Sequence, residues 1–314
     1  MGVGVSHSAG VAMRALQGKV AVVAGATRGA GRGIACMLGE AGATVYCTGR
    51  SSRGKIPARR EEAGSPFDLA RRPETIEETA DLVAARGGVG IPVQIDHTVE
   101  EQVKALFERV EAEQGRLDLL VNDIWGGDAL TEWGKPFWEL SPEKGFLMLQ
   151  RAVHSHILTS RYAAPRMIAR RKGLIVEITD GDNFAYRGNL FYDLVKISVI
   201  RLAYAMSKEL RPHQITALAV TPGFLRSEAM LEHFGVTEAN WQEGAMKDRH
   251  FIASETPFFV GRAVAALAAD PAVSKKSGKV FSSWGLAQEY GFTDIDGRRP
   301  NWGKYFEENV AGKQ

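Results

Sequence analysis

The sequence predicts an α/β fold, a doubly wound parallel sheet with helices on both faces, in a single domain. First, an apolar β-branched run ends at Gly25 and is followed by a glycine-rich turn and a helical pattern. Second, short apolar runs and helical patterns then alternate along the chain, which favours right-handed βαβ crossovers and a parallel sheet. Third, the 314 residues contain no internal repeat and no Pro/Gly/Ser-rich linker that would divide them.

The individual elements follow from the periodicity of the apolar residues. Strands are expected at residues 16–25, 43–48, 89–96, 117–122 and 173–180. Helices are expected at residues 31–42, 73–86, 99–114, about 141–171 and 191–210. We expect a flexible leader at 1–15 and a single domain at 16–314, which includes a basic insertion at 51–72.

Composition and charge exclude several classes of protein. A formal charge of +2 gives no basic field that would favour nucleic acid as a partner. No apolar run reaches the roughly 18 residues of a membrane span. Cys36 and Cys47 indicate neither a disulfide framework nor a metal cluster, and they fit a reducing, cytoplasmic setting. His154 and His156 lie two residues apart on a predicted helix and point to different faces, so no metal site is expected.

The glycine turn after the first strand predicts a phosphate site. Gly25, Gly29 and Gly31 have the spacing G-x-x-x-G-x-G rather than G-x-G-x-x-G. Glycines let the backbone approach a phosphate closely, and the helix N-terminus supplies free N–H groups and a partial positive charge. The alternative is a purely structural turn.

The end of the second strand indicates which dinucleotide this turn prefers. A fold that binds NAD places an acidic residue near this point, where it holds the ribose 2′-hydroxyl. Here the strand ends in Arg50, and Arg28 lies inside the glycine turn. Two guanidinium groups favour a 2′-phosphate, and hence NADP(H). The alternative is that both are solvated surface arginines. The insertion at 51–72 is expected to form either a solvated loop or a cover over the adenosine end of the cofactor.

A candidate general acid/base lies on the helix at 191–210. Tyr192 and Lys196 are four residues apart and therefore share one face. A lysine ammonium beside the phenol lowers the phenol's pKa from about 10 toward working pH. Tyr192 is then a credible general acid/base.

Aromatic residues cluster between residues 123 and 145. Either they line an apolar substrate pocket at the end of a strand, or they fill the core beneath a long loop. The residues are Trp125, Trp133, Phe137 and Trp138.

Together these motifs resemble the short-chain dehydrogenase/reductase (SDR) family, over about residues 16–300. The resemblance is strongest to the group called dehydrogenase/reductase SDR family member 1, to which the segments 277–280 and 290–298 point. The residues that carry it are Gly25, Gly29, Gly31, Thr48, Gly49, Arg50, Asp96, Asn122, Tyr192, Lys196, Pro222 and Gly223.

The resemblance implies a Rossmann-like fold and a set of residue roles. Tyr192 is the implied proton donor, and Lys196 holds the nicotinamide ribose and tunes Tyr192. Asp96 binds the adenine amino group, Asn122 sits over the cofactor, and Ser227 binds the carboxamide from the loop that starts at Pro222. The implied cofactor-binding set is Gly25, Thr27, Arg28, Gly29, Ala30, Gly31, Arg50, Asp96, His97, Asn122, Tyr192, Lys196, Pro222, Gly223, Leu225 and Ser227.

The resemblance also implies a mobile substrate lid and an assembly. The lid is residues 224–255, and a C-terminal extension follows at 284–314. The helices at about 141–171 and 191–211 pair across a two-fold axis in such proteins, so a homodimer or homotetramer is expected. Ile157, Val199 and Leu202 on these helices suit either an interface or the side that faces the sheet.

Three departures from the family pattern affect the expected chemistry. The family's Asn-Asn-Ala-Gly reads Asn-Asp-Ile-Trp at 122–125, and its catalytic asparagine aligns with Ala152. The serine that binds the substrate carbonyl aligns with Asp180, or with Thr179 if the register slips by one. A carboxylate accepts but does not donate unless protonated, and near Tyr192 it raises the phenol's pKa.

Several interpretations of the altered site stay open. Thr179 donates to the substrate if it points into the site, Asp180 favours a cationic substrate such as an iminium, or Asp180 turns away and caps the turn at 181–183. The leading interpretation is an NADP(H)-dependent oxidoreductase that transfers hydride between the nicotinamide and a carbonyl or alcohol of a small organic substrate. The alternatives are an imine reductase or non-redox enzyme that uses Asp180, and a nucleotide-binding protein whose catalytic set has decayed.

Overall fold

A computed structural model of the whole chain describes residues 14–55, 66–68 and 72–310. Most of the expected leader at 1–15, part of the insertion at 51–72 and the last four residues of the C-terminal extension lie outside the described residues.

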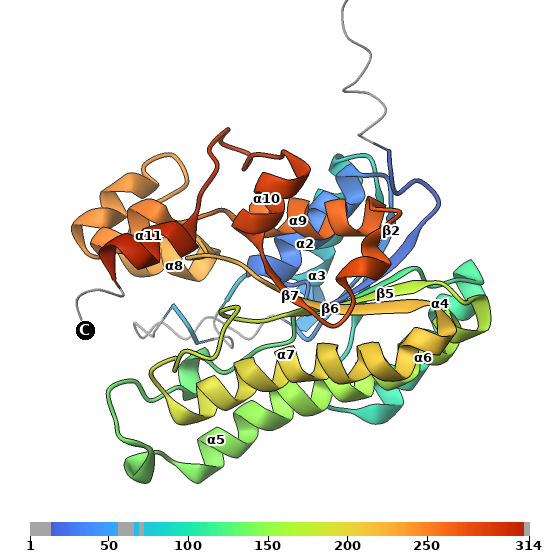
Figure 1. Cartoon of the computed structure of the whole chain (residues 1–314), viewed down its shortest axis with the longest axis horizontal. Helices are drawn as coiled ribbons and strands as arrows, with labels where there is room; N and C mark the ends of the chain where they lie inside the picture. The colour runs from blue at the N-terminus through green and yellow to red at the C-terminus, as the bar shows by residue number, and fades with distance from the viewer. Residues whose placement is uncertain (1–13, 56–65, 69–71, 311–314) are drawn as a thin grey trace, which may run out of the picture.

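A seven-stranded parallel sheet forms the centre of the molecule, in the order β3-β2-β1-β4-β5-β6-β7 (Figure 1). The strand order reverses between β1 and β4, and in such sheets ligands bind at the carboxyl ends of the strands beside this switch point. The predicted fold class is confirmed. The strands are β1 (Val20–Ala24), β2 (Thr44–Gly49), β3 (Val89–Gln94), β4 (Leu119–Asn122), β5 (Gly173–Ile178), β6 (Ile215–Thr221) and β7 (Val280–Ser282).

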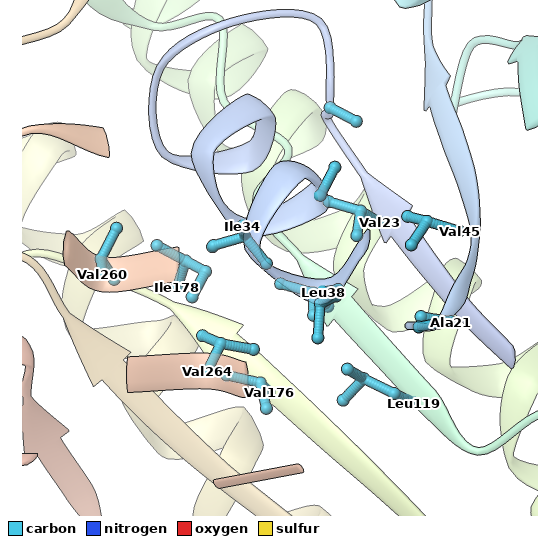
Figure 2. Packing of buried hydrophobic residues seen from close by; sticks show 14 of the residues in the cluster. Ala21, Val23, Ile34, Leu38, Val45, Leu119, Val176, Ile178, Val260 and Val264 are labelled. Carbon is cyan, nitrogen blue, oxygen red and sulfur yellow. The ribbon is translucent and has the colours of Figure 1, made fainter. Parts of the chain in front are cut away.

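Two layers of helices cover the sheet because successive strand residues point to opposite faces. Val23 of β1 packs in a core with Ile34 and Val260 (Figure 2). Val22 packs on the other face with Phe107. The first layer holds α2 (Gly29–Glu40), α3 (Ile76–Ala85), α9 (Pro257–Ala269) and α10 (Ser283–Tyr290), and the second holds α4 (Glu100–Gln114), α6 (Ser155–Arg170) and α7 (Leu190–Leu210).

The boundaries differ from the predicted ones in two instructive places. The first strand starts at Val20 rather than at residue 16, because Gly18 turns the chain with φ of +71°. The helix expected at 141–171 consists of α5 (Pro142–Leu149), a π-helical turn η5 (Gln150–His154) and α6. No helix among the described residues is both long and apolar enough to cross a membrane.

The expected lid at 224–255 is folded, with a small core of its own. It contains α8 (Glu228–Phe234) and the 3₁₀ turns η7 (Trp241–Met246) and η8 (Arg249–Ala253). Phe234, Trp241 and Phe251 are buried against one another. The C-terminal helix α11 (Trp302–Asn309) lies beside it (Figure 1). An edge-to-face contact between Trp302 and Phe224, with 5.6 Å between ring centroids, joins the two.

Glu255 is a buried carboxyl group at the end of this lid. Its Oε2 accepts a hydrogen bond from the Ser283 hydroxyl at 2.7 Å, and its Oε1 has no partner among the described residues. Burial raises the pKa of Glu255 to about 8, against the opposing effect of the hydrogen bonds from Ser283 and the Gly223 N–H. The folded state therefore favours the neutral acid.

Replacing Glu255 with glutamine should make folding stability less sensitive to pH. A carboxyl group whose folded-state pKa is raised stabilises the fold fully below its unfolded pKa, about 4.5, and this contribution is lost as the pH rises through 8. We expect similar melting temperatures for Glu255→Gln and the wild type near pH 4, and a higher one for the variant near pH 9. Thermal melts across this range test it, with the exposed Glu243→Gln as control. Parallel pH profiles of Glu255→Gln and the wild type would contradict the assignment.

Candidate active site

The glycine turn lies against the end of the neighbouring strand β4. A Cβ on Gly25 would lie 2.4 Å from the Asp123 carbonyl oxygen, and one on Gly31 would lie 2.3 Å from the Gly25 carbonyl oxygen. Gly25 and Gly29 have φ of +93° and +58°, in the left-handed region that favours glycine. Helix α2 starts at Gly29 and buries Ala30, so its N-terminus stands at the carboxyl edge of the sheet.

The two arginines expected to bind a 2′-phosphate lie near the end of β2. Arg28 donates to Ser51 Oγ at 3.3 Å and pairs with Glu74 at 3.2 Å. Arg50 is half exposed and lies 3.9 Å from the Asp96 carboxylate. The turn residue Arg28 thus meets the segment that follows Arg50, as a shared anion site requires.

His97 takes a different place from Asp96. Its side chain is buried between the hydroxyls of Thr48 at 2.7 Å and Thr159 at 2.9 Å. Burial lowers the pKa of His97 to about 3, so the ring is neutral. Because both ring nitrogens already have partners in the core, only the backbone of His97 is left to contact a ligand.

A buried polar network begins at Asn122 beneath the switch point. The Asn122 amide donates to Glu177 Oε1 at 2.7 Å and to Ser160 Oγ at 3.0 Å, and its Oδ1 has no partner among the described residues. His156 continues the network, with one ring nitrogen 2.6 Å from Glu177 and the other 3.0 Å from the Ile124 carbonyl. An orphaned buried acceptor at this edge fits a ligand that donates a hydrogen bond.

The loop at Pro222 reaches the glycine turn from the other side. If Gly29 carried a Cβ, Ser227 Cβ would lie 3.9 Å from it and Leu225 Cδ2 would lie 4.0 Å from it. Ser227 caps α8 by accepting from the Met230 N–H. Residues 222–227 therefore form the wall opposite the turn, where the sequence analysis expects the cofactor to lie.

The first turn of α7 presents Tyr192. Asn189 caps this helix, and its side chain accepts from the N–H groups of Phe191 and Tyr192. The Tyr192 hydroxyl donates to Asp180 Oδ2 at 2.8 Å. Lys196 Nζ lies 4.2 Å from the centre of the Trp125 ring and 5.4 Å from that of Tyr192.

Asp180 changes the acidity expected of Tyr192. Burial raises the pKa of the phenol well above its ordinary value, and the charge and hydrogen bond of Asp180 raise it further. The net result is a raised pKa of Tyr192, in the direction expected from Asp180, and not the lowered pKa expected from Lys196 alone. Asp180 faces the phenol rather than capping the turn at 181–183.

Comparisons with known proteins identify the family of this chain. A family model described as Enoyl-(Acyl carrier protein) reductase matches residues 25–281. The Dehydrogenase/reductase SDR family member 1 of Mus musculus is 36% identical over 288 residues, which cover 90% of this chain and 85% of that protein. The protein of the same name from Homo sapiens is 35% identical with the same coverage. The chain belongs to the short-chain dehydrogenase/reductase family.

Solved structures of other SDRs share the fold. A short chain dehydrogenase from Mycobacterium thermoresistibile superimposes with a TM-score of 0.72 at 20% identity, covering 92% of each chain. A metagenomic short-chain oxidoreductase, solved in complex with NADP, superimposes with a TM-score of 0.61 at 23% identity, covering 85% of this chain and 96% of that one.

Thr179 is the second residue that aligns with the SDR serines. Its hydroxyl donates to the Lys196 carbonyl oxygen at 2.7 Å, so it ties β5 to α7. In this arrangement Thr179 does not point its proton toward the phenol. Asp180 alone of the two faces Tyr192.

The aromatic cluster is divided between two environments. Trp125 and Trp133 contact the Tyr192 ring, with centroids 5.5 and 5.1 Å away. Trp133, Phe137 and Trp138 are 58%, 61% and 72% exposed, so the interpretation as core filler is wrong for these three. Trp125 also packs against the buried cluster of Met148, Ala152 and Val195, so it serves the core as well as the surroundings of the phenol.

Two residues that the sequence analysis missed hold the loop between β5 and α7 in place. Arg187 donates to the Asp180 carbonyl and pairs with Asp193 at 2.9 Å, which fixes the loop between β5 and α7. Asn189 orients the turn that carries Tyr192. An asparagine just before a helical pattern is a recognisable N-cap signal, whereas nothing in the sequence reveals the contacts of Arg187.

Proposed function

We propose that this SDR is an NADP(H)-dependent oxidoreductase that interconverts a carbonyl and an alcohol of a small organic substrate. The observation that carries the proposal is the position of the Tyr192 phenol. It lies beside Lys196 and between two tryptophans, at the sheet edge that also bears the glycine turn. That arrangement brings a proton donor and an apolar surface next to an anion site.

The residues of this chain suit a dinucleotide that carries a 2′-phosphate. The close contacts at Gly25 and Gly31 let the turn expose the α2 N-terminus. Arg28 and Arg50 suit the 2′-phosphate, and Asn122 offers an unpaired buried oxygen. A solved neighbour that holds NADP supports the same preference. When bound, NADP(H) supplies or accepts hydride at the substrate carbon.

The protein manages the proton in this reaction. In reduction, the Tyr192 hydroxyl donates its proton to the substrate oxygen, and Lys196 stabilises the phenolate that remains. The same hydroxyl donates to Asp180 in this structure, so a substrate oxygen has to replace Asp180 as its acceptor.

The hydrogen bond between Tyr192 and Asp180 favours a second candidate function, which acts on a cationic substrate such as an iminium. A carboxylate beside the phenol attracts a cation, and the faces of Trp125 and Trp133 do so as well. The positive charge would also offset the rise that Asp180 causes in the pKa of Tyr192. An imine reductase or a non-redox SDR is the function that this observation supports.

We also propose a homodimer or homotetramer, formed through the outer faces of α5 to α7. Phe146, Ile157 and Leu194 on these helices are 65%, 46% and 41% exposed. Of the positions named from the sequence, Val199 is buried, Leu202 is half-buried and only Ile157 is exposed, so the three are not one surface.

Arg50→Ala should weaken NADPH binding by about 1–3 kcal/mol, because one charge-assisted contact to the 2′-phosphate is lost. NADH, which lacks that phosphate, should lose much less affinity. Calorimetric titrations with both cofactors measure the difference. Arg53→Ala is the matched control, since Arg53 is exposed and pairs with Asp81. Equal affinities of the wild type for NADPH and NADH would overturn the NADP(H) assignment.

Tyr192→Phe should reduce turnover by about 10²-fold or more while cofactor affinity stays nearly unchanged, because the phenol mainly transfers a proton. The assay is NADPH consumption over a panel of ketones and cyclic imines. Tyr204→Phe, in the same helix and 39% exposed, is the control and should keep the wild-type rate. An unaltered rate in Tyr192→Phe would refute the acid/base role, and a wild type that binds NADPH but turns over no substrate would favour a decayed enzyme.

Asp180→Ser should shift activity toward ketones, because a hydroxyl donates to a developing oxyanion that a carboxylate repels. It should also lower the pKa of Tyr192 and move the limb of the pH–rate profile that reports this pKa to lower pH. If the substrate is cationic, the same variant should lose activity on imines. If the rates change for neither substrate class and the pH profile does not move, Asp180 has no role in the reaction.

Light scattering at micromolar concentration should return at least twice the 34.2 kDa of one chain. Ile157→Lys should shift the distribution toward monomer, because a charge placed in an apolar interface is costly. Val89→Lys, at a position 54% exposed on the edge strand β3, should leave the mass unchanged. A monomeric wild type would sink the proposed assembly.

A further inference from the structure

A carboxylate of the lid occupies the anion site of the glycine turn. Glu228 Oε2 accepts a hydrogen bond of 2.8 Å from the backbone N–H of Gly29, although the two residues lie 199 positions apart. The other oxygen, Oε1, lies 3.6 Å from the Arg32 guanidinium. The N–H of Gly29 is the first of α2, where the macrodipole favours a negative group.

Helix α8 presents a second carboxylate to the same basic surface. Glu232, one turn after Glu228, pairs with Arg72 at 2.5 Å. Arg72 also pairs with Glu74, which in turn binds Arg28 of the glycine turn. Helix α8 therefore docks through two acids on arginines that surround the expected phosphate positions.

The lid backbone fixes how far Glu228 can reach. Leu225 forms a parallel bridge with Glu255, and Leu225 and Ser227 both lie beside the position of the missing Gly29 side chain. The chain therefore enters α8 directly beside the glycine turn. Arg32 does not depend on Glu228 for a partner, because it also donates to Glu78 at 2.8 Å and to the Thr27 carbonyl at 3.0 Å.

We propose that Glu228 is an internal competitor of the cofactor's diphosphate. Its carboxylate holds the Gly29 N–H when no dinucleotide is bound, and it must leave when a phosphate oxygen takes that donor. Because Glu228 is the first residue of α8, its release loosens the docking of α8 and couples cofactor binding to the lid. This inference rests on the proposed function insofar as the natural ligand is a dinucleotide.

Titration calorimetry with NADPH tests the competition in four proteins. Glu228→Gln should bind about five- to fiftyfold more tightly than the wild type, since a neutral amide competes less well for the N–H than a carboxylate does. Glu228→Asp keeps the charge but is one methylene shorter, and it should also bind more tightly. Glu232→Gln removes the same charge and one docking contact of α8 but leaves the Gly29 N–H occupied by Glu228, so it should gain clearly less affinity than Glu228→Gln.

The pattern across the variants separates occupancy of the site from general electrostatics. An unchanged affinity in Glu228→Gln would overturn the proposal. Equal gains in Glu228→Gln and Glu232→Gln with none in Glu228→Asp would overturn it too, because charge alone would then explain the data. Melting curves of all four proteins check that each is folded.

Hydrogen exchange supplies a readout independent of affinity. Adding NADPH to the wild type should speed amide exchange in residues 228–234, and Glu228→Gln should show faster exchange there before any ligand is added. Wild-type exchange in this segment that falls with NADPH, with no difference in the unliganded variant, would contradict the coupling to α8.

Inorganic pyrophosphate distinguishes failure of this inference from failure of the proposed function. If neither NADPH nor NADH binds any of the four proteins, the proposed function is wrong, and the pyrophosphate titrations decide the role of Glu228 alone. Tighter binding of pyrophosphate to Glu228→Gln and Glu228→Asp than to the wild type and Glu232→Gln supports the competition. Identical pyrophosphate affinities overturn it.

Discussion

The close approach of the glycine turn to the end of β4 is the constraint on which the rest of the site depends. The backbones of Gly25 and Asp123 are in contact, and a Cβ on Gly31 would lie 2.8 Å from the Asp123 carboxylate. This packing without side chains brings the turn against β4 and places the α2 N-terminus at the switch point. The same contact accounts for one departure from the family pattern. What the Gly31 N–H needs at position 123 is an oxygen acceptor, and an aspartate supplies one as an asparagine does.

The substitution at 123 nevertheless alters the electrostatics of the site. Burial raises the pKa of Asp123 to about 7, and the charge of Lys196 and the Gly31 N–H oppose this rise. Asp180 raises the pKa of Tyr192 from the other side. A general acid works best when its pKa lies near the operating pH. The raised pKa therefore makes Tyr192 a weaker general acid unless a further cation, such as a charged substrate, lies beside it. A positively charged substrate would be attracted by Asp180 and would lower the phenol's pKa, which is the physical reason to test imines beside ketones.

Local patterns in the sequence were sufficient for the fold class and for the glycine turn, because each depends on residues close together in the chain. The pairing of Tyr192 with Lys196 on one face of a helix is local in the same sense. The π-helical turn at Gln150–His154 was not predictable, since these residues continue an ordinary helical pattern. Nor was the orientation of Asp180, which depends on Arg187 and on the packing of β5 against α7. The contact of Glu228 with Gly29 joins segments that no periodicity relates.

The C-terminal segment that pointed to one SDR group has a structural role, because it restrains residues 224–255, the expected lid. Asp294 accepts from the Thr256 N–H at 2.8 Å, and Asp296 pairs with the buried Arg226 at 3.2 Å. Arg226 also lies over the Trp241 ring, with 4.1 Å to its centre, so the lid is held at its entry, its interior and its exit. Glu228 follows Arg226 by only two residues. Its release from Gly29 therefore requires a local movement of α8 about an anchored base, not displacement of residues 224–255 as one body.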